Sequence, residues 1–160
     1  MNKFLRVTTF VLAIITIVSA GYVKAGDDNG TLPHVDANHQ FPPNGAHTVR
    51  KTFEIHIPKN SKQISELIIQ IPEVVNSSNN AKDVAVTNGK GKKVKPTITV
   101  KDRNIIINFA EPVPANTQLE VDIKNVRRVK GGNGPVYGVS AKFVGSNTIT
   151  SIGTARFSIR

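Results

Sequence analysis

The sequence predicts an all-β protein, an antiparallel immunoglobulin-like β-sandwich of about eight strands. Apolar and polar residues alternate with a period of two in nearly every apolar segment after residue 52, which is the period of a half-buried strand. Clusters of Pro, Gly and Asn separate these segments, and the segments are short and closely spaced, as in sandwich folds. The chain shows no helical periodicity of any length and no internal repeat.

The expected strands follow one another from residue 53 to the end of the chain. The first, 53–57, alternates cleanly, and the second, 67–71, is more apolar, which suits a central strand. The short third strand ends at the turn signal Asn88-Gly89. The third to eighth expected strands are 84–86, 97–101, 105–109, 119–123, 137–143 and 155–160. Their predicted inward residues are Phe53, Ile55, Ile57, Leu67, Ile69, Ile98, Val100, Ile105, Ile107, Phe109, Leu119, Val121, Ile123, Tyr137, Val139, Phe143, Phe157 and Ile159.

Residues 1–25 have the pattern of a secretory signal peptide. Lys3 and Arg6 give a positive start, residues 11–18 form an apolar centre, and small residues precede a cleavage site after Ala25. A cut after Ala20 is the alternative. The apolar run is shorter than the ~20 residues of a membrane span, so no transmembrane anchor is expected after cleavage. We therefore expect export to the periplasm or the extracellular space.

The mature chain divides into an irregular lead-in and one domain. Residues 26–48 are rich in Asp, Asn, Gly and Pro, which predicts an irregular segment, and residues 49–160 form the single expected sandwich. The chain has no cysteine, which excludes disulfides, thiolate metal sites and a lipoprotein anchor. It has 21 basic and 11 acidic residues, a formal charge of +10, which is compatible with an acidic partner.

Three stretches carry a resemblance to a known family. They are 53–58 with 64–70, then 107–117 with its proline-rich turn, and 131–143 with the closing 153–157. In these stretches the chain resembles a family of exported cyanobacterial proteins catalogued as domain of unknown function 2808. The resemblance implies an exported or envelope β domain, and it supplies no catalytic residues. The segments 88–95 and 124–130 depart from the family pattern.

The lead-in carries a candidate metal site. Neutral imidazole together with carboxylate suits copper or zinc, and the lead-in offers both groups. A periplasmic copper- or zinc-binding protein is therefore one hypothesis, and ordinary solvated loop residues are the alternative. The candidate ligands are His34, Asp36, His39 and His47.

Two basic clusters give a candidate binding surface for an anionic polymer. The alternative is a lysine-rich edge that discourages association between strands. Nucleic acid is not expected as a partner, because aromatic residues are not interleaved with the cations and the protein is exported. The first cluster is Lys90, Lys92, Lys93 and Lys95, and the second is Lys124, Arg127, Arg128 and Lys130.

The sequence offers little support for an enzyme. It contains no Gly-x-Ser-x-Gly nucleophile motif. The strand carboxylates Glu54, Glu120 and Asp122 fall on polar faces without an evident catalytic partner. We therefore expect no cofactor and a non-enzymatic binding or structural module of the cell envelope. Its expected partner is an anionic envelope polymer or another envelope protein.

Overall fold

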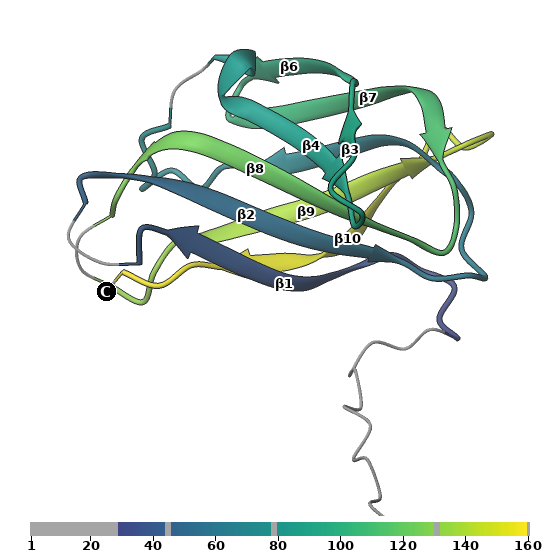
Figure 1. Cartoon of the computed structure of the whole chain (residues 1–160), viewed down its shortest axis with the longest axis horizontal. Helices are drawn as coiled ribbons and strands as arrows, with labels where there is room; N and C mark the ends of the chain where they lie inside the picture. Colours follow the sequence, from purple (N-terminus) through teal and green to yellow (C-terminus); the bar gives the residue numbers. More distant parts are fainter. Residues whose placement is uncertain (1–28, 44–45, 78–79, 130–131, 160) are drawn as a thin grey trace, which may run out of the picture.

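The computed structural model describes residues 29–43, 46–77, 80–129 and 132–159. Two antiparallel five-stranded sheets form a sandwich, which confirms the predicted fold class (Figure 1). The first sheet has the order β1 (His34–Phe41), β2 (Thr48–Ile57), β8 (Thr117–Arg127), β4 (Val84–Asn88) and β5 (Lys93–Val94). The second has the order β10 (Ile149–Arg156), β9 (Val136–Phe143), β3 (Ile64–Gln70), β7 (Asn104–Val113) and β6 (Thr97–Lys101). A short 3-10 helix, η1 (Ala81–Asp83), precedes β4.

The expected signal peptide, residues 1–25, lies outside the described residues. The part of the chain that the structure describes has no helix with the length and hydropathy of a membrane span.

The prediction of an irregular lead-in is wrong for residues 34–41, which form β1 and pair with β2 along its length. Two features hide this strand in the sequence. A bulge between Val35 and Ala37 shifts the register, which breaks the period-two pattern. Most of the β1 side chains are also only half buried, so polar residues are tolerated on both faces.

The position of the last strand also differs from the prediction, which placed it at 155–160. The observed β10 runs from Ile149 to Arg156, and the next residue, Phe157, donates its backbone N–H to the Pro135 carbonyl. A register shift between Ser151 and Gly153 interrupts the alternation in β10. The other expected strands coincide with β2, β3, β4, β6, β7, β8 and β9, apart from shifts at their ends.

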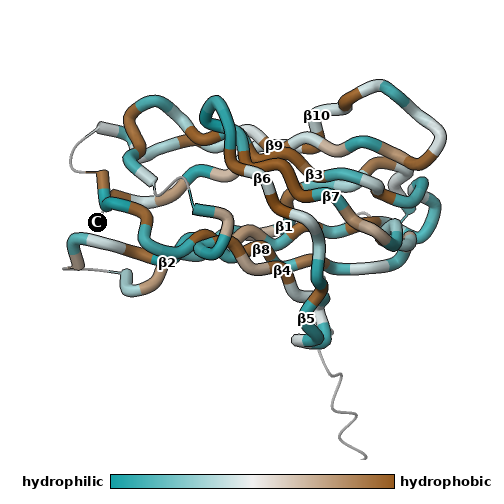
Figure 2. Tube along the Cα trace, turned by 90° about the horizontal axis from the view of Figure 1, so that it is seen from above, coloured by the Kyte–Doolittle hydropathy of each residue, from teal (hydrophilic) through white to brown (hydrophobic). Residues whose placement is uncertain are grey.

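The core lies between the two sheets, where the apolar residues of both layers face each other (Figure 2). Of the predicted inward residues, only Ile98, Val100 and Ile159 are half buried, and all the others are buried. Three aromatic rings from β2, β9 and the segment after β10 meet edge to face with centroids 5.1–5.3 Å apart. These rings belong to Phe53, Tyr137 and Phe157.

The two long edges of the sandwich differ. At one edge β1 lies against β10, where the Asn38 side chain donates to the Arg156 carbonyl across 2.8 Å and Gly153 contacts Val35. This contact joins the two sheets. The other edge is formed by β6 and by β5, which has only two residues. In Figure 1 β6 lies at the top of the sandwich, and β1 and β10 lie at the bottom.

Candidate functional site

Of the three histidines expected to bind metal, His34 and His39 are engaged in separate pairs, and His47 is exposed. His39 Nε2 lies 2.9 Å from Glu54 Oε1, and the His34 ring packs against the His56 ring with centroids 5.2 Å apart. No group of three or more His, Cys, Asp or Glu side chains among the described residues is placed to hold a metal ion. The structure therefore does not assemble the expected site from its four candidate ligands, His34, Asp36, His39 and His47.

The two basic clusters lie at opposite ends of β8. Strand β4 runs antiparallel beside β8, so that Asn88 faces Leu119 and Val84 faces Ile123. The hairpin after Asn88, which carries the first cluster, therefore lies beside the start of β8, whereas the second cluster lies at its end. Leu119 and Arg127 are eight positions apart along the strand, or about 26 Å. The structure therefore does not join the two clusters into one continuous basic surface.

The members of the two clusters differ in their availability. The four lysines of the hairpin are exposed and form no ion pair with another described residue. In the second cluster Lys124 and Arg127 are exposed, and Lys130 lies outside the described residues.

Arg128, the remaining member, has a structural role. Its guanidinium donates to three carbonyls of the segment between β1 and β2: Nε to Ala46 across 2.9 Å, Nη1 to Pro43 across 2.8 Å and Nη2 to Pro42 across 2.7 Å. These bonds satisfy carbonyls that no strand partner reaches. Arg128 therefore holds this loop in place, and few of its donors remain for a ligand.

A basic corner forms instead around the second cluster, and we use this name for Phe41, Arg50, Lys124 and Arg127. The first three of these line a hollow of about 350 Å³ on the outer face of the first sheet. Phe41 is 62 % exposed, an unusual fraction for a large aromatic side chain. The remaining lining residues are Pro42, Thr48, Val49 and Asn125.

Strand register and one bulge bring these side chains together. Phe41 lies opposite Arg50 in the β1–β2 pair, and the β2–β8 register shifts between Val49 and Lys51. On β8, Asn125 has a φ of 54°, in the left-handed region that Asn adopts more readily than most residues. Lys124 and Arg127, on either side of this position, are exposed, while Val126 between them is buried. In a regular strand, residues three apart would point to opposite faces.

Arg50 is braced but accessible. Its guanidinium carbon lies 5.9 Å from the centroid of the Phe41 ring, and its Nε lies 3.5 Å from Asp122 Oδ1. The same carboxylate oxygen accepts a hydrogen bond from Thr52 Oγ1 across 2.5 Å. The Arg50 side chain remains 47 % exposed. The corner therefore combines an oriented guanidinium with an aromatic face and two further cations.

Sequence reasoning missed Phe41 and Arg50. Phe41 falls in the segment predicted to be irregular, and Arg50 precedes the first strand that the alternation identified. The sequence reveals positive charges only where they are neighbours along the chain. Arg50 and Lys124 are far apart in the chain and come together through strand pairing.

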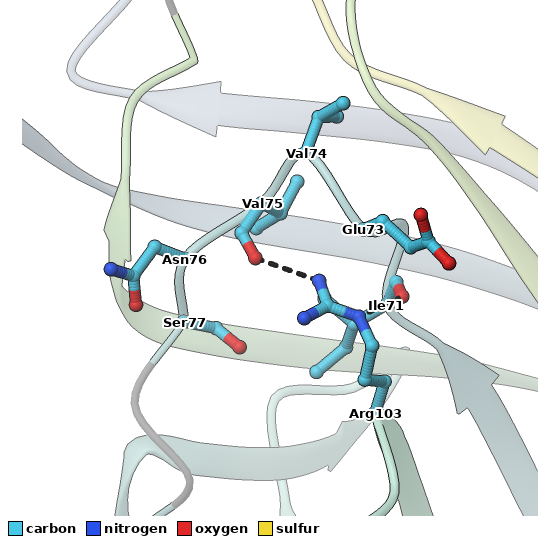
Figure 3. Close-up of a pocket in the computed structure, with 7 residues that line it drawn as sticks. All are labelled: Ile71, Glu73, Val74, Val75, Asn76, Ser77 and Arg103. Carbon is cyan, nitrogen blue, oxygen red and sulfur yellow. Dashed lines mark hydrogen bonds between the residues drawn. The ribbon is translucent and has the colours of Figure 1, made fainter.

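A second arginine, like Arg128, stabilises a loop. Arg103, in the β6–β7 turn, donates Nε to the Ile71 carbonyl across 3.2 Å and Nη2 to the carbonyls of Val75, across 2.8 Å, and Pro72. Figure 3 shows its guanidinium inside the loop after β3, beside a hollow of about 320 Å³. Its donors are directed at backbone carbonyls, which indicates a loop-stabilising role.

Lys51 is the second feature that the sequence analysis missed. Its side chain points into the core and is 2 % exposed, and Nζ donates to Gln40 Oε1 across 2.8 Å. Burial, together with the smaller effect of the positive charge of Arg128, lowers the pKa of Lys51 from 10.5 to about 8. Burial also raises the pKa of Tyr137, whose hydroxyl has no hydrogen-bond partner among the described residues.

Sequence comparison identifies the family. Over residues 35–159 the chain matches the family described as "Protein of unknown function (DUF2808)". The chain belongs to the DUF2808 family. The matched range covers nearly all of the sandwich, from the second residue of β1 past the end of β10. No protein with a curated description matches the sequence.

Solved structures resemble this DUF2808 domain in fold. The N-terminal domain of the Streptococcus gordonii adhesin Sgo0707 is 11 % identical with a TM-score of 0.54, over 81 % of this chain and 32 % of that chain. BslA, described as a bacterial hydrophobin, is 10 % identical with a TM-score of 0.50, over 82 % of this chain and 95 % of that chain. The DUF2808 chain thus spans about a third of the adhesin chain. At these identities the likeness shows the fold alone.

Proposed function

We propose that this protein is an exported, non-enzymatic binding module of the cell envelope, and that its basic corner holds an anionic polymer. The observation that carries the proposal is the hollow where Arg50 and Lys124 meet the exposed ring of Phe41. A guanidinium binds carboxylate or phosphate through two parallel hydrogen bonds, and an aromatic face suits the apolar side of a sugar ring. An acidic polysaccharide offers both groups in every few units.

The shape of the corner suits a polymer. Its residues come from three adjacent strands, β1, β2 and β8, so they lie across an open sheet face. Phe41, Arg50 and Lys124 follow one another across these strands, and Arg127 lies opposite Thr48 nearby. A chain that crosses the strands would meet the aromatic ring and then successive cations.

Several observations support a location outside the cytoplasm. Residues 1–25 have the pattern of an export signal, and the stretches quoted above resemble an exported cyanobacterial family. One protein with a similar fold is described as an adhesin. Together they favour a periplasmic or extracellular location in a cyanobacterium.

Two carboxylates on the outer face of the first sheet, Glu54 and Asp122, are engaged within the sheet, which favours binding over catalysis. Glu54 accepts from Gln118 across 3.3 Å and pairs with His39, and Asp122 is held by Thr52 and Arg50. Oxygens engaged in this way stabilise the sheet. A metal-binding function has less support, because no group of three or more His, Cys, Asp or Glu side chains among the described residues is placed to hold a metal ion.

The experiment is retention on immobilised polygalacturonate with two matched variants. One variant neutralises the corner with Arg50→Gln, Lys124→Gln and Arg127→Gln, and the other neutralises the hairpin with Lys90→Gln, Lys92→Gln and Lys93→Gln. Each variant loses three positive charges, so the two variants have the same net charge. They differ only in which end of β8 has lost its cations. We expect the corner variant to elute at a clearly lower salt concentration than the hairpin variant. Equal elution of the two variants would show that net charge alone explains retention.

A further inference from the structure

Strand β6 leaves one edge of the second sheet unpaired. It pairs only with β7 in the described part of the chain, and no other described backbone group bonds to residues 97–101. The opposite edge is different, because β10 there is covered by β1. An edge strand with free N–H and C=O groups is a template for another strand.

The sequence of β6 lacks several of the features that protect an edge. Thr97, Ile98, Thr99 and Val100 are residues with β-branched side chains, and neither a proline nor a bulge interrupts the strand. Five residues are enough for several backbone hydrogen bonds with an added strand. The strand is therefore well suited to pairing.

Apolar side chains beside this edge are incompletely covered. Ile98 and Val100 point toward the core but are only half buried, as is Val94 on the two-residue strand β5. Because β5 ends so soon, the first sheet does not extend over them. An added strand with apolar side chains on its inner face would cover this surface.

The charges around β6 indicate the chemistry of a strand that would pair with it. Between Val84 and Lys101 the chain carries five lysines and no acidic residue: Lys90, Lys92, Lys93, Lys95 and Lys101. All five are exposed. The acidic residues around this edge include Asp102, 3.8 Å from Lys101, and Glu111, in a hollow with Lys95. Asp83 lies on η1, which contacts β6. The edge therefore has a positive surround that repels a second copy of itself and attracts an acidic segment.

We infer that β6 is a strand-addition site for an extended segment of another envelope protein, in which apolar and acidic side chains alternate. The apolar side chains cover Ile98, Val100 and Val94, and the acidic side chains face the lysines. Backbone pairing supplies the affinity, and the alternating side chains supply the specificity. This gives the first basic cluster a role separate from that of the basic corner.

The test uses a synthetic probe, the acetylated and amidated peptide Glu-Val-Glu-Val-Glu-Val-Glu, and hydrogen exchange in the full chain after signal removal. We expect the probe to slow exchange at least tenfold at amides within residues 97–101. Two control peptides each lose one property of the probe. The first has Lys in place of Glu, which keeps the ability to form a strand but reverses the charge. The second has Pro in place of Val, which keeps the negative charge but prevents strand pairing. Neither control should protect these amides. Protection by the Pro peptide, or none by the probe, overturns the proposal.

Variants separate this site from the basic corner. Replacing Lys93, Lys95 and Lys101 by Gln should weaken binding of the probe at least tenfold, whereas neutralising Arg50, Lys124 and Arg127 should change it less than twofold. Both sets of residues are exposed, so both variants should fold. Equal effects on the probe would overturn the proposal. So would a free protein that dimerises through residues 97–101, or a free monomer in which these amides are already protected by its own chain.

Discussion

The Lys51 ammonium nitrogen lies 4.1 Å from the centroid of the Phe157 ring, in the core of the sandwich. Tyr137 is the second ring nearby, at 5.7 Å, and Gln40 accepts the hydrogen bond described above. The positive charge is thus stabilised by two aromatic faces and one amide oxygen, with no carboxylate bonded to it in the described part of the chain. A lysine held in this way makes the stability of the fold depend on pH.

The free energy of unfolding should rise with pH above neutrality. The folded-state pKa of Lys51 is about 8, below the ordinary value of 10.5, so between these values the unfolded state binds more protons. From pH 7.5 to 9.5 this group should add up to about 2 kcal/mol of stability. The Lys51→Met variant should lack this rise. Urea unfolding at both pH values measures it, and parallel changes in the two proteins would contradict the account.

Removal of the Arg128 guanidinium should release the loop between β1 and β2. Arg128→Gln deprives the carbonyls of Pro42, Pro43 and Ala46 of their donors, which should lower the free energy of unfolding by about 2 kcal/mol. Arg127→Gln is the matched control, since its side chain is exposed, and should cost less than about 0.5 kcal/mol. Chemical denaturation compares them, and similar losses in both would argue against the clamp.

Two phenylalanines should be essential to the core and one should not. Phe143→Ala and Phe157→Ala should each destabilise by about 3–5 kcal/mol, because both rings are buried. Phe41→Ala should leave the melting temperature nearly unchanged but reduce retention on polygalacturonate. Thermal melts and elution profiles of the three variants give the comparison. A large loss of stability in Phe41→Ala would mean that this ring serves packing rather than binding.

Two glycines with similar backbone angles should respond differently to alanine. Gly132 has φ +79° with open space around an added Cβ, so its replacement should cost about 1 kcal/mol. Gly134 has φ +82°, but an added Cβ would lie 2.1 Å from the Phe157 carbonyl oxygen. Gly134→Ala should therefore cost roughly 3 kcal/mol, since the backbone must move. Equal melting temperatures of the Gly132→Ala and Gly134→Ala variants would show that Gly134 is not as close to the Phe157 carbonyl oxygen as in the structure.

Period-two alternation identified most of the fold because most strands bury one face and expose the other. It failed where the strand pairing is irregular. Bulges at Val35–Ala37 in β1 and at Ser151–Gly153 in β10 shift the register, and the hydrophobic pattern shifts with it. The β5 strand has only two residues, too few to show any period.

Lys51 could have been identified from the pattern, at least in part. It shares the odd-numbered positions of Val49, Phe53 and Ile55, which all face the core. A charged residue in this register predicts either an edge or a buried partner, but the sequence does not say that Gln40 and Phe157 lie nearby. The basic corner could not be located from the sequence for the same reason, because Lys124 and Arg127 on β8 meet Arg50 on β2 only through strand pairing.

The proposed function depends most on where an anionic polymer touches the sandwich, and NMR mapping tests this directly. Isotope-labelled protein without its signal peptide would be titrated with polygalacturonate oligomers at low salt. The largest shifts should fall on the backbone amides of Phe41, Thr48, Arg50, Lys124 and Arg127, with little change in the β4–β5 hairpin. Shifts centred on Lys90, Lys92 and Lys93, or spread evenly over all exposed cations, would contradict the central claim.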